Sequence, residues 1–262
     1  MTEDAWQALA DPFVDGAYAT VKGKVRTFVL HQQLLRHLTG PPASVLDVGG
    51  GAAHQSLPLA RLGFRVTVLD SSPAMLAKAE QRLSTEPAHV RDRVRLVQAA
   101  GESAAEATGE QQFSAVLCHG VLMYQPNPEP LLDALCRCVE PNGLVSVMAL
   151  NAATMAVRPA LERRWADALA GFGTTHETGV LGTPTRGDTV EDLTRLLSHR
   201  GVRAEAWCGV WLFADWMDLP AEGTDIEAVA AVELEASVRD PYRQLSRVFH
   251  LVGRRSGCDR RV

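Results

Sequence analysis

Lysine is scarce in this sequence. Only three lysines stand beside 23 arginines in 262 residues, and the chain carries a formal net charge of −5 with a pI near 5.9. An acidic balance gives no global electrostatic reason to bind nucleic acid, although a local basic patch is compatible with it. We attribute the preference for arginine mainly to the codon bias of a GC-rich genome, so a single arginine is not by itself a functional signal.

Cysteine pairs with disulfide or metal-ligand spacing are also missing. The chain has an odd number of cysteines, five, and none of them forms a C-x-x-C pair. We therefore expect buried free thiols in a reducing compartment, and neither a disulfide framework nor a metal site. The five are Cys118, Cys136, Cys138, Cys208 and Cys258.

Long apolar runs are absent as well. No run approaches the roughly 18 apolar residues of a membrane span. The first residues, "MTEDAWQALADPF", lack the basic and apolar regions of a signal peptide. We expect a cytoplasmic protein that does not enter a membrane.

Apolar segments with the length of buried strands alternate with helical patterns along the first 150 residues. Apolar strands separated by helices predict a parallel sheet that is covered on both faces, with ligands bound at the carboxyl ends of the strands. A further strand is predicted near the end of the chain, over 247–255. The predicted strands of the first part are 44–48, 64–70, 94–99, 113–119 and 143–150.

A glycine loop follows the first predicted strand, in "VLDVGGGAAHQ" (45–55). The loop matches a dinucleotide fingerprint only in part, because His54 stands at the third glycine position, and no Walker lysine follows. Asp70 ends the second strand, where a carboxylate suits a ribose diol and disfavours a 2′-phosphate. NAD, FAD and other adenosine ligands stay open on this basis. Glycines with Asp47 just before them fit a ligand that carries an ammonium and a carboxylate, as S-adenosylmethionine does.

Four motifs resemble those of class I S-adenosylmethionine-dependent methyltransferases, in the same order and spacing. They are "VLDVGGG", "VTVLDSSPAML", "AAGES" and "VLCHGVLMYQPNPEPLLDALCRCVEPNGLVSVMALN", and they cover roughly residues 44–151. The resemblance implies a Rossmann-like α/β fold. Its seven-stranded sheet would be mostly parallel with the last strand antiparallel, with helices on both faces and an N-terminal helical lid.

The same resemblance implies how a single domain over 1–262 is organised. A helical lid would come first, then a cofactor-binding core, substrate-side helices with an insertion, and C-terminal strands with a helix. Gly and Thr are frequent in the insertion, which we expect to be a loop or a mobile lid. The corresponding ranges are 1–40, 44–151, 152–200 and 201–254.

A narrower similarity, of modest identity, extends over nearly the whole chain. "FVDGAYATVKGKVRTFVLHQQL", "GVWLFADWM" and "AVELEASVRDPYRQLSRVFHLVGRR" are similar to the SmtA/CmoM group, whose best-known members methylate the carboxylate of 5-carboxymethoxyuridine at the tRNA wobble position. Carried over, Arg26 would hold the cofactor carboxylate, Asp70 its ribose, Gly101 and Glu102 its adenine, and His119 its methionine part. The full predicted cofactor set is Arg26, Asp47, Gly49, Gly50, Gly51, Asp70, Ser71, Gly101, Glu102 and His119.

The chain departs from that group in the insertion after the fifth strand. "FGTTHETGVLGTPTRG" holds one arginine and no lysine, whereas members of the group carry a lysine-rich run there. Since phosphate contacts dominate nucleic-acid affinity, we favour a small-molecule acceptor methylated on a carboxylate or hydroxyl oxygen. A wobble uridine in tRNA is the second candidate, and a non-catalytic cofactor-binding protein is the third.

Methyl transfer from a sulfonium mainly needs alignment and a dry pocket. An ionised carboxylate acceptor needs no base, whereas a hydroxyl or amine is helped by one. His119, Tyr124 and His54 are the candidate bases, and His119, at the end of the fourth strand, is the best placed. A packing or surface role stays open for each predicted site residue. Tyr18, Lys22, Tyr124 and Asn151 are the predicted substrate-side residues.

Overall fold

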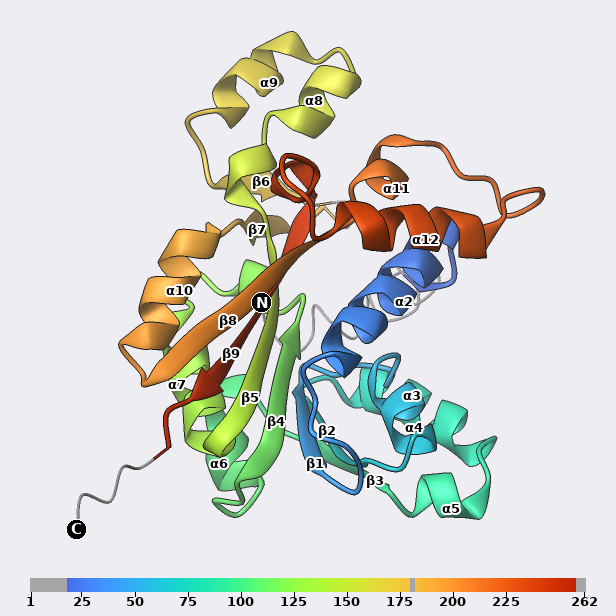
Figure 1. Ribbon diagram of the computed structural model, residues 1–262, viewed down its shortest axis with the longest axis vertical. Coiled ribbons are helices and arrows are strands. Elements are labelled where there is room, and N and C mark those ends of the chain that lie inside the picture. Colours follow the sequence, from blue (N-terminus) through green and yellow to red (C-terminus); the bar gives the residue numbers. More distant parts are fainter. Residues whose placement is uncertain (1–17, 180–181, 258–262) are drawn as a thin grey trace.

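A seven-stranded sheet forms the centre of the protein (Figure 1). The computed structural model describes residues 18–179 and 182–257. The strand order is β3-β2-β1-β4-β5-β9-β8, and β9 alone runs antiparallel to its neighbours in this sheet. The predicted fold class is therefore confirmed. The strands are β1 (Ser44–Val48), β2 (Arg65–Asp70), β3 (Val94–Gln98), β4 (Phe113–His119), β5 (Val139–Leu150), β8 (Val202–Val210) and β9 (Val248–Arg255).

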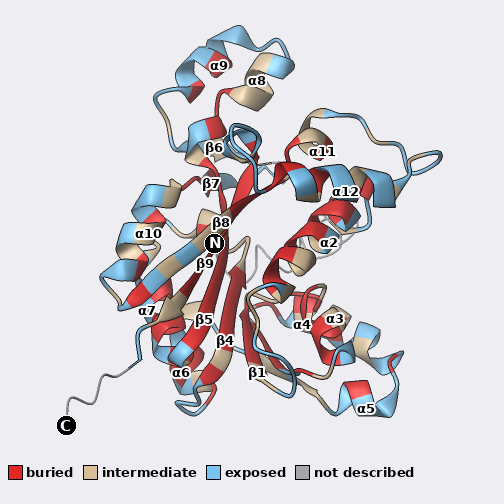
Figure 2. Cartoon of the chain, viewed as in Figure 1, coloured by how far each residue is buried: buried red, intermediate tan, exposed pale blue. Residues whose placement is uncertain are grey.

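Helices cover both faces of this sheet (Figure 2). Local signals start several of them: the Thr20 hydroxyl accepts from the backbone N–H of Gly23 at 3.1 Å, and Ser72 caps a helix that has Pro73 in its first turn. The helices are α2 (Val21–Leu35), α3 (Ser56–Arg61), α4 (Pro73–Ser84), α5 (Ala88–Arg91), α6 (Ala104–Ala107), α7 (Glu129–Cys138), α8 (Val157–Leu161), α9 (Trp165–Gly171), α10 (Val190–Ser198), α11 (Phe213–Trp216) and α12 (Ile226–Ala236).

Alternating side chains of the strands divide the core into two layers. Leu46 and Val48 of β1 pack with α6, α7 and α10, whereas Val45 packs on the other face with α3, α4 and α5. A strand that is buried on both faces has a continuous run of apolar residues, so the sequence alone could predict such strands.

The segment after β5 is irregular. The region of the predicted substrate-side helices begins with a 3-10 turn, η4 (Ala152–Thr154), followed by two separate short helices, α8 and α9. The predicted loop over the insertion contains a short hairpin, β6 (His176–Thr178) with β7 (Pro184–Arg186). Helices α8 and α9 project away from the sheet (Figure 1).

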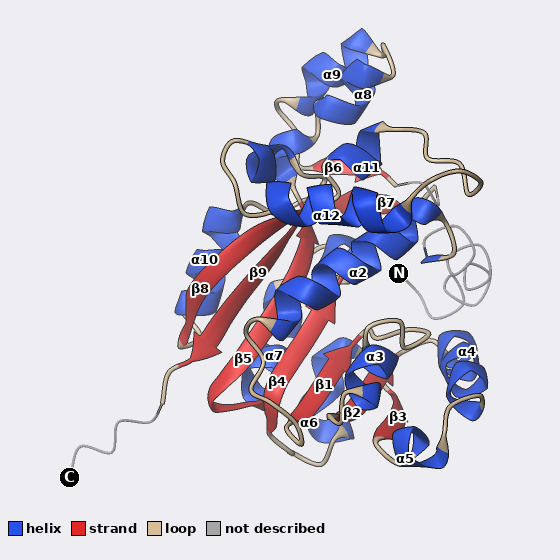
Figure 3. Cartoon of the chain, turned by 45° about the vertical axis from the view of Figure 1, so that its right-hand side comes forward, coloured by secondary structure: helices blue, strands red, loops and turns tan. Residues whose placement is uncertain are grey.

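The described part of the N-terminal region is a helix that lies near the carboxyl end of the sheet. Helix α2 packs against α12, as Figure 3 shows. Residues 1–17 of the predicted lid lie outside the described residues. Within the described ranges, no helix is long and apolar enough to cross a membrane. The predicted division at residues 40, 151 and 200 stays a prediction.

Candidate active site

A cavity of about 340 Å³ opens at the carboxyl ends of the central parallel strands, where an open α/β sheet binds its ligands. Such a volume is within the usual range of small-molecule sites, about 300–1,000 Å³. The loops that follow β1, β2, β3 and β4 form its wall, together with Tyr18. Of the residues predicted to hold a cofactor or a substrate, the wall contains Tyr18, Gly49, Gly51, Asp70, Ser71, Gly101, Glu102, His119 and Tyr124.

The glycine loop turns sharply next to the cavity. Gly49 and Gly51 have φ of 71° and 53°, a region that favours glycine. A Cβ on Gly51 would lie 2.7 Å from Cε of Met75, so a side chain at this point would displace the end of Met75. The backbone N–H of Gly49 donates to the carbonyl of Leu69 at 2.7 Å. The loop is thus fixed against β2 with its backbone on the cavity wall.

Asp70 presents its carboxylate where β2 ends. Its Oδ2 accepts from the backbone N–H of Gly51 and its Oδ1 from that of Ser72, each at 2.9 Å. Burial raises the pKa of Asp70, and the two backbone hydrogen bonds partly offset this. Each oxygen keeps a further lone pair, so the group is positioned to accept from ligand hydroxyls.

Asp47 lies behind the glycine loop and is not one of the residues that line the cavity. Its Oδ2 accepts from the Ser56 hydroxyl at 2.6 Å, and a Cβ on Gly50 would lie 2.8 Å from the same oxygen. Burial raises the pKa of Asp47 to about 6. The geometry therefore gives Asp47 a supporting position behind the loop, not the predicted place beside a cationic ligand group.

His119 belongs to a buried chain of hydrogen bonds that runs from the cavity to α2. Its Nε2 lies 2.8 Å from the Ser146 hydroxyl, which lies 2.7 Å from Nε2 of His250. Nδ1 of His250 lies 3.0 Å from Oε1 of Gln33. The Gln33 amide nitrogen donates to the carbonyl of Gly209 at 2.9 Å, which fixes the side-chain oxygen toward His250.

This chain of hydrogen bonds determines which ring nitrogen of His119 carries the proton. Because Gln33 presents an oxygen, Nδ1 of His250 is the donor and its Nε2 accepts from Ser146. Ser146 then accepts from Nε2–H of His119, which leaves Nδ1 of His119 as a lone pair. That Nδ1 is buried and has no hydrogen-bond partner in the described chain. Burial, together with the charge of Arg26, lowers the pKa of His119 to about 3.

Arg26 stands next to the cavity without being one of its lining residues. Its guanidinium lies 4.3 Å from the ring centre of Tyr18 and 4.9 Å from that of Trp211. Tyr18 in turn stacks on His54 with ring centres 3.8 Å apart. Burial lowers the pKa of His54 to about 3. Arg26 therefore contacts a residue of the cavity wall, Tyr18, and His54 stacks on the ring of the same tyrosine.

Lys22 and Asn151, both predicted on the substrate side, are not among the cavity residues. Lys22 forms an ion pair with Asp215 and lies 4.6 Å over the Trp211 ring. The Asn151 amide nitrogen donates to the carbonyls of Gln244 and Ser246 at 3.2 and 3.0 Å, and its oxygen accepts from the backbone N–H of Ala153. Asn151 thus caps η4, with both ends of its amide bound to backbone, and its place on the substrate side stays a prediction.

The sequence missed the residues behind His119. Ser146, His250 and Gln33 are separated from one another by long stretches of chain, and each has the ordinary appearance of a polar residue in a strand or helix. The same holds for Asp215, Arg158 and Arg247, which form ion pairs between segments that are distant in the sequence. No pattern in a single sequence reports such pairings.

The comparisons with known proteins agree with this geometry. A family model described as "Methyltransferase domain" matches residues 46–147. The tRNA 5-carboxymethoxyuridine methyltransferase of Escherichia coli K12 is 26% identical over 259 residues, covering 97% of each chain. A ubiquinone biosynthesis O-methyltransferase of Xanthomonas oryzae is 36% identical over 109 residues, which cover 42% of this chain and 44% of that one.

Solved structures share the fold. A glycopeptide N-methyltransferase, MtfA, in complex with S-adenosylmethionine has a TM-score of 0.57 at 18% identity, covering 88% of this chain and 94% of that one. Together with the methyltransferase-domain match over residues 46–147 and the relative that aligns over 97% of the chain, this makes the chain a class I S-adenosylmethionine-dependent methyltransferase. The CcbJ methyltransferase of Streptomyces caelestis has a TM-score of 0.60 at 17% identity, covering 95% and 96%. S-adenosylmethionine is accordingly the cofactor of this methyltransferase, and two features of the cavity wall suit that molecule: the close glycine backbone and the Asp70 carboxylate.

Proposed function

We propose that this methyltransferase transfers a methyl group to an oxygen of a small-molecule acceptor, and that the oxygen belongs to a carboxylate. The observation that carries the proposal is the state of His119. With a pKa near 3 it is a weak base, and burial raises the pKa of the Tyr124 phenol to about 12. An acceptor that arrives already ionised needs neither group to remove a proton.

The residues of the cavity wall would hold the cofactor as follows. Asp70 would accept from the ribose hydroxyls, Gly49 and Gly51 would bring their backbone close to the amino-acid part, and Gly101 with Glu102 would flank the adenine. Ser71 would lie beside Asp70, and Gly50 would hold the turn. When bound, S-adenosylmethionine supplies an electrophilic methyl group.

His119 and Arg26 would complete the amino-acid end of the site. Nδ1 of His119 accepts hydrogen bonds only, so it suits an ammonium donor and repels a carboxylate. The Arg26 guanidinium, held over Tyr18, suits the carboxylate. In this arrangement His119 orients the cofactor, and the acceptor oxygen attacks without transferring a proton to the protein.

A wobble uridine of tRNA is the second candidate acceptor. It is supported by the relative named tRNA 5-carboxymethoxyuridine methyltransferase, which aligns over 97% of both chains. Against it stand the net charge of −5 and the insertion without lysine. The arginine of that insertion, Arg186, is bound to Asp188 at 2.6 Å and to the carbonyl of Gln125 at 3.1 Å. Its charge is therefore already matched within the protein.

The test uses the full chain with methyl-labelled S-adenosylmethionine, once with a protein-free metabolite extract and once with total tRNA. We expect a product of the extract that has gained one labelled methyl group, 14 daltons plus the extra mass of the isotope, and that loses its label as methanol in mild alkali, because methyl esters hydrolyse there and methyl ethers do not. Label that enters only tRNA would favour the second candidate. Tight cofactor binding with no turnover in either arm would favour the non-catalytic alternative.

A further inference from the structure

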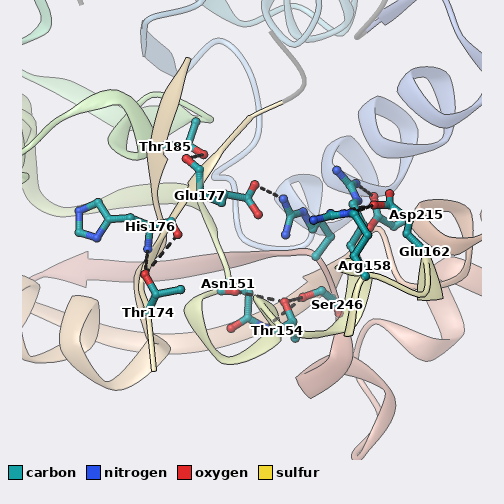
Figure 4. Close-up of polar contacts among 12 residues, drawn as sticks. Asn151, Thr154, Arg158, Glu162, Thr174, His176, Glu177, Thr185, Asp215 and Ser246 are labelled. Carbon is teal, nitrogen blue, oxygen red and sulfur yellow. Dashed lines mark hydrogen bonds and ion pairs between the residues drawn. The ribbon is translucent and has the colours of Figure 1, made fainter. Parts of the chain in front are cut away.

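A cluster of charged side chains lies beside Trp211, away from the cavity wall. Lys22 of α2 and Arg158 of α8 both form ion pairs with Asp215 of α11. Arg247, just before β9, forms an ion pair with Glu177 of β6. Figure 4 shows Glu177 pointing toward the side on which Arg158 and Asp215 lie. We call these five residues the basic cluster.

The basic cluster has more cations than carboxylates. Three cationic groups face two acidic ones, and each of the five is at least partly buried. Arg158 and Arg247 are both close enough to Lys22 to lower its pKa, in addition to the larger effect of burial. The buried Glu233 carboxylate lies beside Asp215, and burial with a contribution from Asp215 raises the pKa of Glu233. The surplus of positive charge is therefore confined to the side of Lys22, Arg158 and Arg247, where it is costly unless an anion offsets it.

Two buried polar atoms of the basic cluster lack hydrogen-bond partners in the described chain. Lys22 and Arg158 both bind Oδ1 of Asp215, while Oδ2 of this residue, whose side chain is 1% exposed, has no partner. Nη1 of Arg247, whose side chain is 7% exposed, has no partner either. An unpartnered guanidinium N–H group is suited to carboxylate and phosphate oxygens.

The basic cluster adjoins the candidate active site through Trp211. Lys22 lies one helical turn before Arg26 on α2, and both cations lie over the Trp211 ring. The indole Nε1–H of Trp211 donates to the backbone carbonyl of Lys22 at 2.9 Å, and its own carbonyl accepts from the backbone N–H of Arg247 at 2.8 Å. Trp211 therefore joins the cluster to Arg26, which stacks on the cavity residue Tyr18.

We propose that the basic cluster binds a second anionic group of the methyl acceptor, a carboxylate distinct from the one that is methylated, with Arg158 and Nη1 of Arg247 as its principal donors. This rests on the proposed function, because it names the class of small molecule that the enzyme accepts. Lys22 and Arg158, whose side chains are 29% and 23% exposed, form the entry side. Asp215 holds both cations in place and at the same time opposes the incoming anion.

Because Asp215 opposes the anion, substitutions of Arg158 and of Asp215 should change the affinity for carboxylates in opposite directions. Arg158→Gln removes a donor for the anion, and Asp215→Asn removes a competing carboxylate. We expect benzoate and acetate to bind at least tenfold more weakly to Arg158→Gln and at least threefold more tightly to Asp215→Asn. Arg164→Gln, an exposed arginine that pairs with Glu162 and Asp167, is the control with the same charge change. Calorimetry on the full chain saturated with S-adenosylhomocysteine measures each affinity.

A purely structural ion-pair cluster would give a different result. Both substitutions would then lower the thermal unfolding temperature, and carboxylates would bind no better than benzamide and acetamide, their uncharged partners. Equal binding of acids and amides, or changes of the same direction in both variants, would overturn the proposal. If an acceptor from the extract is methylated equally well by the wild type and by Arg158→Gln, the anion site is refuted and the proposed function stands. Failure of carboxylates to bind, together with Arg158-dependent binding of tRNA, would overturn both.

Discussion

The Ser146 hydroxyl lies 2.8 Å from Nε2 of His119 and fixes which nitrogen of this histidine carries the proton. The lone pair is thereby left on Nδ1, at the ring edge without another partner in the described chain. Because Ser146 is itself bound to His250, the position of a proton at the cavity depends on a side chain of the last strand.

Ser146→Ala would break this chain at its centre. We expect the free energy of unfolding to fall by about 1–3 kcal/mol, because the substitution leaves buried imidazole nitrogens unsatisfied. Ser114→Ala removes a hydroxyl of β4 that is bound to Glu140 near the surface, and we expect a loss of about 1 kcal/mol or less. Nitrogen NMR of the wild type should show His119 as the neutral Nε2–H tautomer at pH 7. An Nδ1–H tautomer would contradict the assignment.

The pH dependence of turnover would separate an ionised acceptor from one that needs a base. With the pKa of His119 near 3 and that of Tyr124 near 12, neither group titrates between pH 6 and 9. We therefore expect kcat/KM with a carboxylate acceptor to be flat over this interval. A limb near neutral pH that disappears in His119→Gln would show instead that His119 acts as a general base.

Gly51→Ala would test the close approach of the glycine loop. Its Cβ would meet Cε of Met75 at 2.7 Å, in addition to strain from φ of 53°. Gly109→Ala is the matched control, because φ is 70° there and nothing lies within 4 Å. Both should lose about 1–2 kcal/mol of stability from the left-handed backbone, whereas only Gly51→Ala should weaken S-adenosylmethionine binding by tenfold or more. Equal affinity in the two variants would remove the loop from the cofactor site.

Asp47 gives a prediction about stability and pH. Its folded pKa of about 6 is raised above 3.8, so the folded state holds a proton between these values that the unfolded state has lost. The ionised carboxylate therefore costs stability above pH 6, and this cost disappears as the pH falls toward 4. Each pKa unit is worth about 1.4 kcal/mol, so the whole change is about 3 kcal/mol.

Buried histidines change the free energy of unfolding in the opposite direction as the pH falls. The contribution of Asp47 is therefore measured as the difference between the wild type and Asp47→Asn. The stability of wild type relative to Asp47→Asn should rise by about 2 kcal/mol as the pH falls from 7 to 4. Denaturant unfolding at several pH values measures it. A difference that does not change with pH would show that Asp47 has an ordinary pKa.

The features of the fold and of the site that the sequence predicted are local ones. Apolar runs bounded by Gly and Pro marked the strands, and the glycine loop and Asp70 lie directly after two of them. Their meeting at one edge follows from the parallel topology alone. Asn151 was predicted by the same logic, but the chain turns into η4 there and uses its amide as a cap.

The parts that the sequence did not predict depend on packing between distant segments. His119 is 27 residues from Ser146, which is 104 residues from His250. Lys22 is 193 residues from Asp215. Whether such side chains meet depends on which face of a strand or helix each one occupies after folding, and a single sequence carries no record of that choice.

Calorimetric titration of S-adenosylmethionine into wild type, Asp70→Ala and Asp92→Ala tests whether the cofactor binds in the cavity at the ends of the parallel strands. Asp70 would accept the ribose hydroxyls, whereas Asp92 is an exposed residue at the end of α5 and serves as the control. Thermal unfolding of both variants verifies that they are folded. We predict that Asp70→Ala binds at least tenfold more weakly and that Asp92→Ala binds like the wild type. Unchanged affinity in a folded Asp70→Ala would contradict the placement of the cofactor in this cavity.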